Sequence, residues 1–244
     1  AQLLEAALAC ASRGWPVAPA FWIMPDGRCV CKKTCASPGK HPILQEGFKA
    51  ASTDPKTIRT WWEERPHANL LVPTGEVSGF DVLDVDPRVG GDDALDELER
   101  ELGELPATVE VITGAAGRHL YFHHVNGLRN SAGLLGDGLD VRGGGGYVLV
   151  PPSNHLSGQL YTWELSSHPD EVTIAPWPEG LLERLRTAPG TSVAPAEPGG
   201  VIPAGKRNQR LTALAGAARR QGATEAELLA LLREVNEARC APPL

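Results

Sequence analysis

Two aspartates at the end of an apolar run have the residue type and spacing that most clearly indicate chemistry in this chain. The segment Phe80–Pro87 (FDVLDVDP) has the composition of a buried strand and carries Asp84 and Asp86 at its end. Side chains alternate along a strand, so both carboxylates point the same way, about 7 Å apart. They repel each other unless a cation lies between them, and divalent cations prefer oxygen ligands. The pair therefore indicates a metal site; alternatively, the aspartates cap the following helix or face solvent.

A glycine-rich turn ahead of another apolar run adds basic residues. In residues 113–122 (TGAAGRHLYF) the turn brings Arg118 and His119 to the start of a strand on which His119 and Tyr121 share one face. Backbone amides in such a turn, with Arg and His beside them, suit phosphate oxygens. The segment therefore favours phosphate binding, and the alternative is an ordinary hairpin with a histidine in the core and Tyr121 packed there as well.

A third polar segment, residues 138–153 (GLDVRGGGGYVLVPPS), follows downstream. Asp140 and Arg142 fall on one face of its first strand. The four glycines after Arg142 let the backbone turn tightly or approach a ligand closely. Taken by itself, this segment indicates a glycine-rich hairpin with an Asp–Arg pair on its surface.

A loop over residues 25–47 gathers three thiols and an imidazole, from Cys29, Cys31, Cys35 and His41. Zinc takes such a set of ligands tetrahedrally, whereas a disulfide between Cys29 and Cys31 would be strained. The metal would fold a polar loop that has no core of its own. The alternative is a set of reduced surface thiols with a free histidine. Lys40 either reaches phosphate groups from this loop or is solvated.

The remaining pattern predicts interleaved strands and helices, hence an α/β (α+β) fold. Helices are expected over 2–12, from Pro55 behind an Asp54 cap, over 92–102 and over 179–186; strands are expected at 69–72, 80–86, 108–113, 119–124, 138–142, 147–150 and 160–164. Residues 187–204 have linker composition. Two amphipathic helices, 208–221 and 224–239, follow, and Thr224 with Glu227 forms a capping box at the second.

The bulk composition limits the classes of function. The net charge of −7 argues against a broad basic surface that grips duplex DNA, although a local basic groove remains open. An apolar fraction of 42% supports a proper core. The sequence has no apolar run long enough to predict a membrane span, and no leader is evident. A cytoplasmic protein with no membrane partner is therefore expected.

Taken in order, the three polar segments resemble the primase–polymerase (prim-pol) family of the archaeo-eukaryotic primase superfamily. The family carries an acidic D-x-D strand, a glycine-rich turn ending in His followed by aromatics, and a third Asp leading into G-G-Y-V-x-x-P-P-S. The resemblance covers about residues 1–185. The family's second motif often reads Ser-x-His, and this chain has Gly117 at the first position. Many members also carry a Cys-rich loop ending in P-G-K-H-P, found here at 38–42.

This resemblance implies a two-layer mixed sheet with flanking helices, a zinc loop and a small C-terminal helical appendage. The expected domains are a catalytic domain over 1–186, the linker and a helical segment over 205–244, which resembles the opening of the primase C-terminal helical domain. Two Mg²⁺ or Mn²⁺ ions would be held by Asp84, Asp86 and Asp140. The residues expected to contact the nucleotide are His119, Arg118, Arg142 and Lys40. Zn²⁺ would be structural, on Cys29, Cys31, Cys35 and His41.

The resemblance also implies a DNA primase/polymerase. Its partners would be a single-stranded DNA template, ribo- or deoxynucleoside triphosphates and, in such families, a replicative helicase, in the replication of a plasmid, phage or mobile element. A gap-filling repair polymerase without priming activity is the nearest alternative. A non-catalytic single-strand or nucleotide-binding module is a further one, although binding phosphate does not need three carboxylates. A metal-dependent nuclease also clusters aspartates but fits the Arg118–His119 turn less well.

Overall fold

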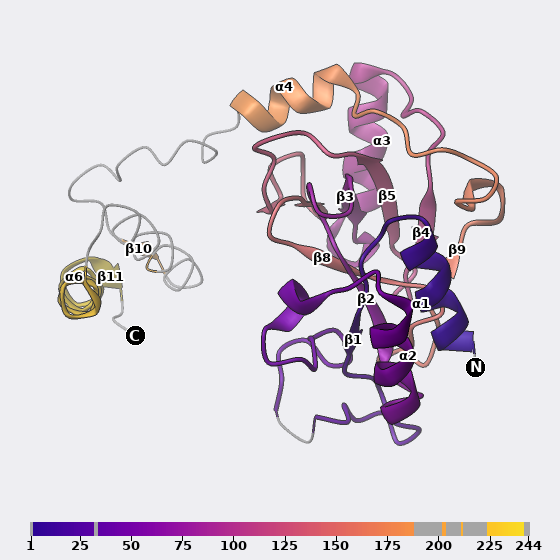
Figure 1. Cartoon of the computed structure of the whole chain (residues 1–244). Coiled ribbons are helices and arrows are strands. Elements are labelled where there is room, and N and C mark those ends of the chain that lie inside the picture. Colours follow the sequence, from indigo (N-terminus) through magenta and orange to yellow (C-terminus); the bar gives the residue numbers. More distant parts are fainter. Residues whose placement is uncertain (1, 32–33, 188–201, 204–210, 212–223, 242–244) are drawn as a thin grey trace. The chain divides into compact units, whose positions relative to one another are not determined.

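The computed structural model describes residues 2–31, 34–187, 202–203, 211 and 224–241 (Figure 1). The chain divides into two compact units, Ala1–Thr187 and Ala188–Leu244, and each is described by itself. The α/β class is confirmed. The strands of the first unit form two sheets whose ladders are antiparallel throughout, and this is the detail in which they differ from the expected two-layer mixed sheet.

The larger sheet has six strands in the order β6-β7-β3-β5-β4-β9. Their bounds are β3 Phe80–Val85, β4 Glu110–Ile112, β5 Arg118–His123, β6 Ser131–Ala132, β7 Leu139–Arg142 and β9 Thr162–Trp163. The apolar run that ends in the two aspartates is thus an inner strand, paired with β5 on one side and β7 on the other.

Two helices cover one face of this sheet, α3 (Gly91–Leu102) and α4 (Glu179–Thr187). Leu83 and Val85 of β3 point to this face and belong to one buried cluster with Leu95 of α3 and Leu181 of α4. Figure 1 shows the two helices together at the top of the first unit. This face is therefore largely apolar beneath the two helices.

The opposite face of β3 packs on a three-stranded sheet, ordered β1-β2-β8, and on helices α1 and α2. The bounds are α1 Gln2–Ser12, β1 Ala18–Ala20, α2 Pro55–Glu64, β2 Asn69–Pro73 and β8 Tyr147–Val150. Phe80, Val82 and Tyr121 share a buried cluster with Leu71 and Val148 of the smaller sheet. The two sheets thus enclose a second core, which ends where β3 becomes polar.

Local signals set several boundaries as predicted. Asp54 caps α2, where its carboxylate accepts hydrogen bonds from the backbone amides of Lys56 and Thr57. Three short 3-10 turns complete the first unit, at Gly47–Ala50 (η1), Pro87–Val89 (η2) and Leu165–Ser167 (η3). The strand expected over 160–164 is shorter, because Leu160 pairs back to Asn154 across a turn and leaves only Thr162–Trp163 for the sheet.

The second unit contains α6 (Glu225–Arg239) and a parallel pair of two-residue strands, β10 (Ile202–Pro203) and β11 (Cys240–Ala241). The predicted capping box is present, because the Glu227 carboxylate accepts from the Thr224 amide at 2.7 Å. The helix expected over 208–221 and most of the expected linker lie outside the described residues. Among the described helices, none has the length and apolar character needed to cross a membrane.

The approach of Gly138 to Asp86 generates a stability prediction. The Asp86 amide donates to the Gly138 carbonyl at 2.8 Å, Gly138 has φ +71°, and a Cβ there would lie 2.6 Å from the Asp86 carbonyl oxygen. Gly138→Ala should cost roughly 1–2 kcal/mol for the backbone conformation, and about 1–3 kcal/mol more for the clash.

Gly127→Ala is the matched control, because Gly127 has φ +83° with nothing within 4 Å of the added carbon. Urea unfolding of both variants measures the difference. Equal losses of stability would contradict the close contact between Gly138 and Asp86.

Candidate active site and zinc-binding loop

The register of the larger sheet brings together three of the residues singled out by sequence. Asp84 of β3 lies directly opposite His119 of β5 and opposite Asp140 of β7. Residues opposite one another in an antiparallel ladder share a face, so all three point to the side of the smaller sheet. The closest approach of His119 to Asp84 is 3.5 Å, between Nε2 and Oδ1.

Arg142 connects the two carboxylates across the strands. Its guanidinium donates to Asp84 Oδ2 at 2.9 Å and to Asp140 Oδ2 at 3.0 Å, and its Nε lies 3.3 Å from Asp84 Oδ2. Asp140 also accepts from the amide of Gly133 at 3.1 Å. The predicted shared face of Asp140 and Arg142 is present, and it places a positive charge between two negative ones.

Asp86 is compensated by a residue that the sequence reasoning missed. Its carboxylate caps η2 by accepting from the Arg88 amide at 3.0 Å, and it also takes a two-point contact from the Arg88 guanidinium at 2.9 and 2.7 Å. These hydrogen bonds lower the pKa of Asp86 and raise that of Arg88. The Asp-Pro-Arg sequence could have predicted this contact, because a capping aspartate can bind the side chain of the residue two positions later.

His119 is buried at the inner end of the site. Loss of solvent lowers the pKa of His119 below its usual value, although the nearby Asp84 charge opposes the effect. The ring is therefore neutral near pH 7. Its Nδ1 is buried without a hydrogen-bond partner among the described residues. Buried polar atoms are rarely left unpaired, so this nitrogen marks a place where a ligand atom or water completes the site.

These side chains line a cavity of about 230 Å³, together with Lys40 from the cysteine loop and Gly117 from the glycine-rich turn. An adjoining cavity of about 270 Å³ shares Lys40, Asp84 and His119 and extends to Tyr147 of β8. Burial lowers the pKa of Lys40, and the carboxylate of Asp84 opposes that shift. The cleft between the two sheets is thus lined by carboxylates and cations together.

Arg118 does not reach this cleft. It lies opposite Val85 in the ladder, which places it on the face covered by α3 and α4. There its guanidinium binds the nearly buried Glu110 carboxylate at 2.6 and 3.1 Å, and this pairing raises the pKa of Arg118. Adjacent residues of a strand point to opposite faces, so Arg118 and His119 cannot serve one pocket from a regular strand.

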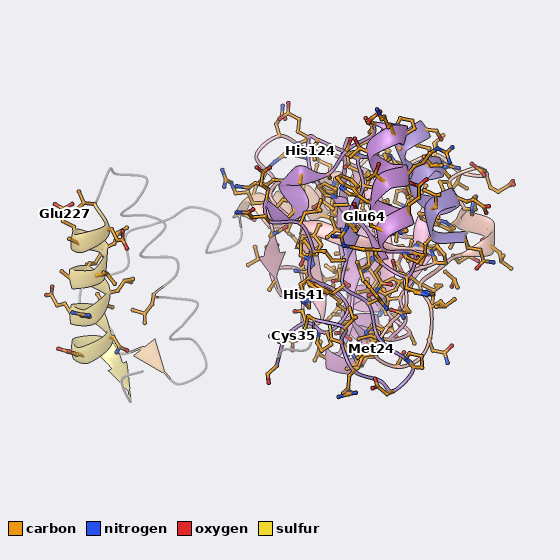
Figure 2. All side chains as sticks on the ribbon, turned by 60° about the horizontal axis from the view of Figure 1, so that its bottom comes forward. Met24, Cys35, His41, Glu64, His124 and Glu227 are labelled. Atoms are coloured by element: carbon orange, nitrogen blue, oxygen red, sulfur yellow. The ribbon has the colours of Figure 1, made fainter. Side chains whose placement is uncertain are left out.

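The cysteine loop brings its four predicted ligands together. The donor atoms of Cys29, Cys31, Cys35 and His41 all lie within 4.8 Å of one another, and they are the one such group of three or more acidic, Cys or His residues among the described residues. Figure 2 shows Cys35 and His41 near one another at the edge of the unit. Three sulfurs and one nitrogen fit tetrahedral zinc.

Hydrogen bonds prepare the loop for a metal. His41 Nδ1 donates to the carbonyl of Ser37 at 3.0 Å, which leaves the Nε2 lone pair available. The Gly39 amide donates to Cys29 Sγ at 3.4 Å. Without a cation, desolvation and the neighbouring thiols raise the pKa of Cys35 to about 11, and a bound metal reverses that balance by favouring the thiolate. The buried Cys10 lies in the α1 core and is not part of this group.

An acidic and basic cleft between two antiparallel sheets, closed at its mouth by a Cys₃His loop, defines an α/β protein built to handle phosphate groups with cations. The chain belongs to the family described as bifunctional DNA primase/polymerase, N-terminal, whose model matches residues 7–179. The model described as primase C terminal 1 matches residues 199–244. No curated protein matches the chain. The expected family is therefore confirmed over both parts of the sequence.

The zinc-binding prediction can be tested by metal content. The purified chain should carry about one zinc ion per molecule, held by four protein ligands. Cys31→Ser and His41→Ala should each lose most of it, as measured by elemental analysis after dialysis. Cys10→Ala is the control and should retain the metal. A full zinc content in Cys31→Ser would refute the assignment.

Proposed function

We propose that this chain is a template-dependent nucleotidyltransferase that synthesises primers on single-stranded DNA and extends them. The proposal depends on one observation, the register that sets Asp84 opposite both His119 and Asp140 in a cleft with Arg142. Membership in the primase/polymerase family supports the same class of reaction. The replication of a plasmid, phage or other mobile element is the biological setting we propose.

The three carboxylates suit divalent metal ions. Asp84, Asp86 and Asp140 are partly exposed, supply only oxygen donors and line one cavity. Their oxygens do not form as close a group as the zinc ligands, and Arg88 and Arg142 neutralise them in this structure. Two Mg²⁺ or Mn²⁺ ions bound there would stabilise the attacking and leaving oxygens of phosphoryl transfer.

The protein's own side chains would orient the nucleotide. The guanidiniums of Arg142 and Arg88 already bind the carboxylates. A metal ion that bound the carboxylates in their place would free these guanidiniums to bind triphosphate oxygens. His119 stays neutral, and its Nε2, the ring nitrogen beside Asp84, would offer a hydrogen bond rather than a charge. Lys40 adds a partly buried ammonium to the same cavity. Each group positions phosphate, and none needs to act as a general base.

The activity assay separates this proposal from its alternatives. Labelled nucleotides, Mn²⁺ or Mg²⁺ and unprimed single-stranded DNA should give new primers. Asp84→Asn and Asp140→Asn should each lower the rate roughly 100-fold or more, which is typical for loss of one group that stabilises transition-state charge. Extension of a primed template alone would indicate a repair polymerase. Degradation of labelled DNA without nucleotides would indicate a nuclease, and no reaction at all a binding module.

Arg142 and Arg118 make a matched pair on opposite faces of the sheet. Arg142→Gln should weaken binding of a non-hydrolysable triphosphate by about tenfold or more, since hydrogen bonds to charged groups contribute about 1.5–3 kcal/mol. Arg118→Gln should leave that affinity unchanged. It should instead lower the stability to urea, because Glu110 loses its partner. Isothermal titration measures the affinities, and a loss of nucleotide binding in Arg118→Gln would contradict the structure.

A further inference from the structure

A continuous groove leads away from the catalytic cleft on the side of the glycine-rich turn. The cavity at the carboxylates shares Arg88, Thr113 and Ala115 with a depression of about 710 Å³ along that turn. This depression shares His155 and Leu160 with a wider one of about 760 Å³ that reaches Trp22. We call these two connected depressions the lateral groove.

The floor of the lateral groove is a tight contact between two loops. A Cβ added to Gly114 would lie 2.2 Å from the Cβ of His155, so the glycine-rich turn touches the loop between β8 and β9 directly. The Ser157 hydroxyl donates to the carbonyl of Gly114 and ties the same two loops together. Gly114 therefore lets the two loops pack closely at the floor of the lateral groove.

The charge along the lateral groove is unusual for this chain. The chain has 30 acidic and 23 basic residues, yet no Asp or Glu lies among the described residues that line either depression. Arg88 stands at the end nearest the carboxylates, and His67 and His155 lie farther along. By contrast, the depression beside α3 is lined by Asp93, Glu97, Glu101 and Asp137. A polyanion would meet no repulsion from the walls of the lateral groove.

The far end of the lateral groove offers flat and apolar contacts. The half-buried Trp22 lies with its ring 6.4 Å from that of His67, and both line the wider depression. Leu156 and Leu160 are about half exposed there, at 50% and 49%. Unpaired bases stack on such surfaces regardless of their identity, whereas the paired bases of a duplex are already stacked.

His155 adds one directed hydrogen-bond donor. Its Nδ1 accepts from the Ser157 amide at 3.1 Å, so the neutral ring carries its proton on Nε2. The described residues provide no partner for that Nε2. The nitrogen therefore can donate to a phosphate or to a base edge in the lateral groove.

We propose that the lateral groove binds the single-stranded template next to the catalytic cleft, with bases stacked at Trp22 and packed on Leu156 and Leu160. The proposal deepens the proposed function and rests on it for the identity of the strand as template. It follows from the continuity with the cleft, the absence of acidic groups from the described walls, and the apolar surface. The nucleotide would remain in the cleft beside the carboxylates.

The test compares single-stranded DNA binding in full-chain variants, measured by fluorescence anisotropy with a labelled mixed-sequence oligonucleotide. Trp22→Ala should weaken binding about tenfold, which matches the loss of one stacked base. Trp22→Phe should retain most of the affinity. Leu156→Glu and Leu160→Glu, at exposed positions that tolerate polar groups, should each weaken it at least as much by introducing charge.

Leu165→Glu is the matched control, because Leu165 is 91% exposed and lines none of these depressions. Nucleotide affinity should be unchanged in every variant. Unaltered DNA binding in Trp22→Ala and Leu160→Glu would overturn the proposal. A shift from dimer to monomer in those variants during sedimentation would also overturn it, because the groove would then bind a second copy of the chain. If the parent chain binds DNA through the lateral groove but makes no primers, the proposed function fails and the groove assignment stands.

Discussion

The pairing register of β3 is the constraint on which the candidate site depends. Because Asp84 lies opposite His119 and Asp140, alternate residues of three strands bring carboxylates, a histidine and Arg142 to one face. The residues between them, Leu83 and Val85, join the core under α3 and α4. A slip of one residue would bury the carboxylates against apolar helices and expose the leucine, so the same free energy that stabilises the core also enforces the geometry of the site.

Charge balance explains how an acidic cluster persists at the edge of a core. Arg142 spans two carboxylates and Arg88 holds the third, so no aspartate is left uncompensated where solvent is partly excluded. Both contacts involve partly exposed guanidiniums, so they cost little to exchange for another cation. The pair of Arg118 with Glu110 is of a different kind, because its guanidinium is partly exposed but its carboxylate is nearly buried and has no other cation beside it in the described structure.

The cysteine loop links three parts of the first unit. Lys40 lines the cleft, Pro25 and Gly27 line the lateral groove, and the side-chain amide of Asn69 in β2 donates to the Gly39 carbonyl at 2.9 Å. The side chain of Asn154 accepts a hydrogen bond from the backbone amide of Ile23 and donates one to the backbone carbonyl of Ile23. A metal that orders this loop would therefore act on the cleft and on the lateral groove at once.

Local patterns in the sequence determined the strand that carries Asp84 and Asp86, the cysteine cluster, the Asp54 cap and the capping box, because each depends on residues within a few positions of one another. The alternation of β5 could also have shown that Arg118 and His119 face opposite ways. Only the tertiary structure decided that Glu110 pairs with Arg118, that Arg142 bridges two strands, and that Gly114 packs on His155. Those contacts join segments whose separation along the chain follows no periodic pattern. They form only when burial of a common core determines which strands pair with one another.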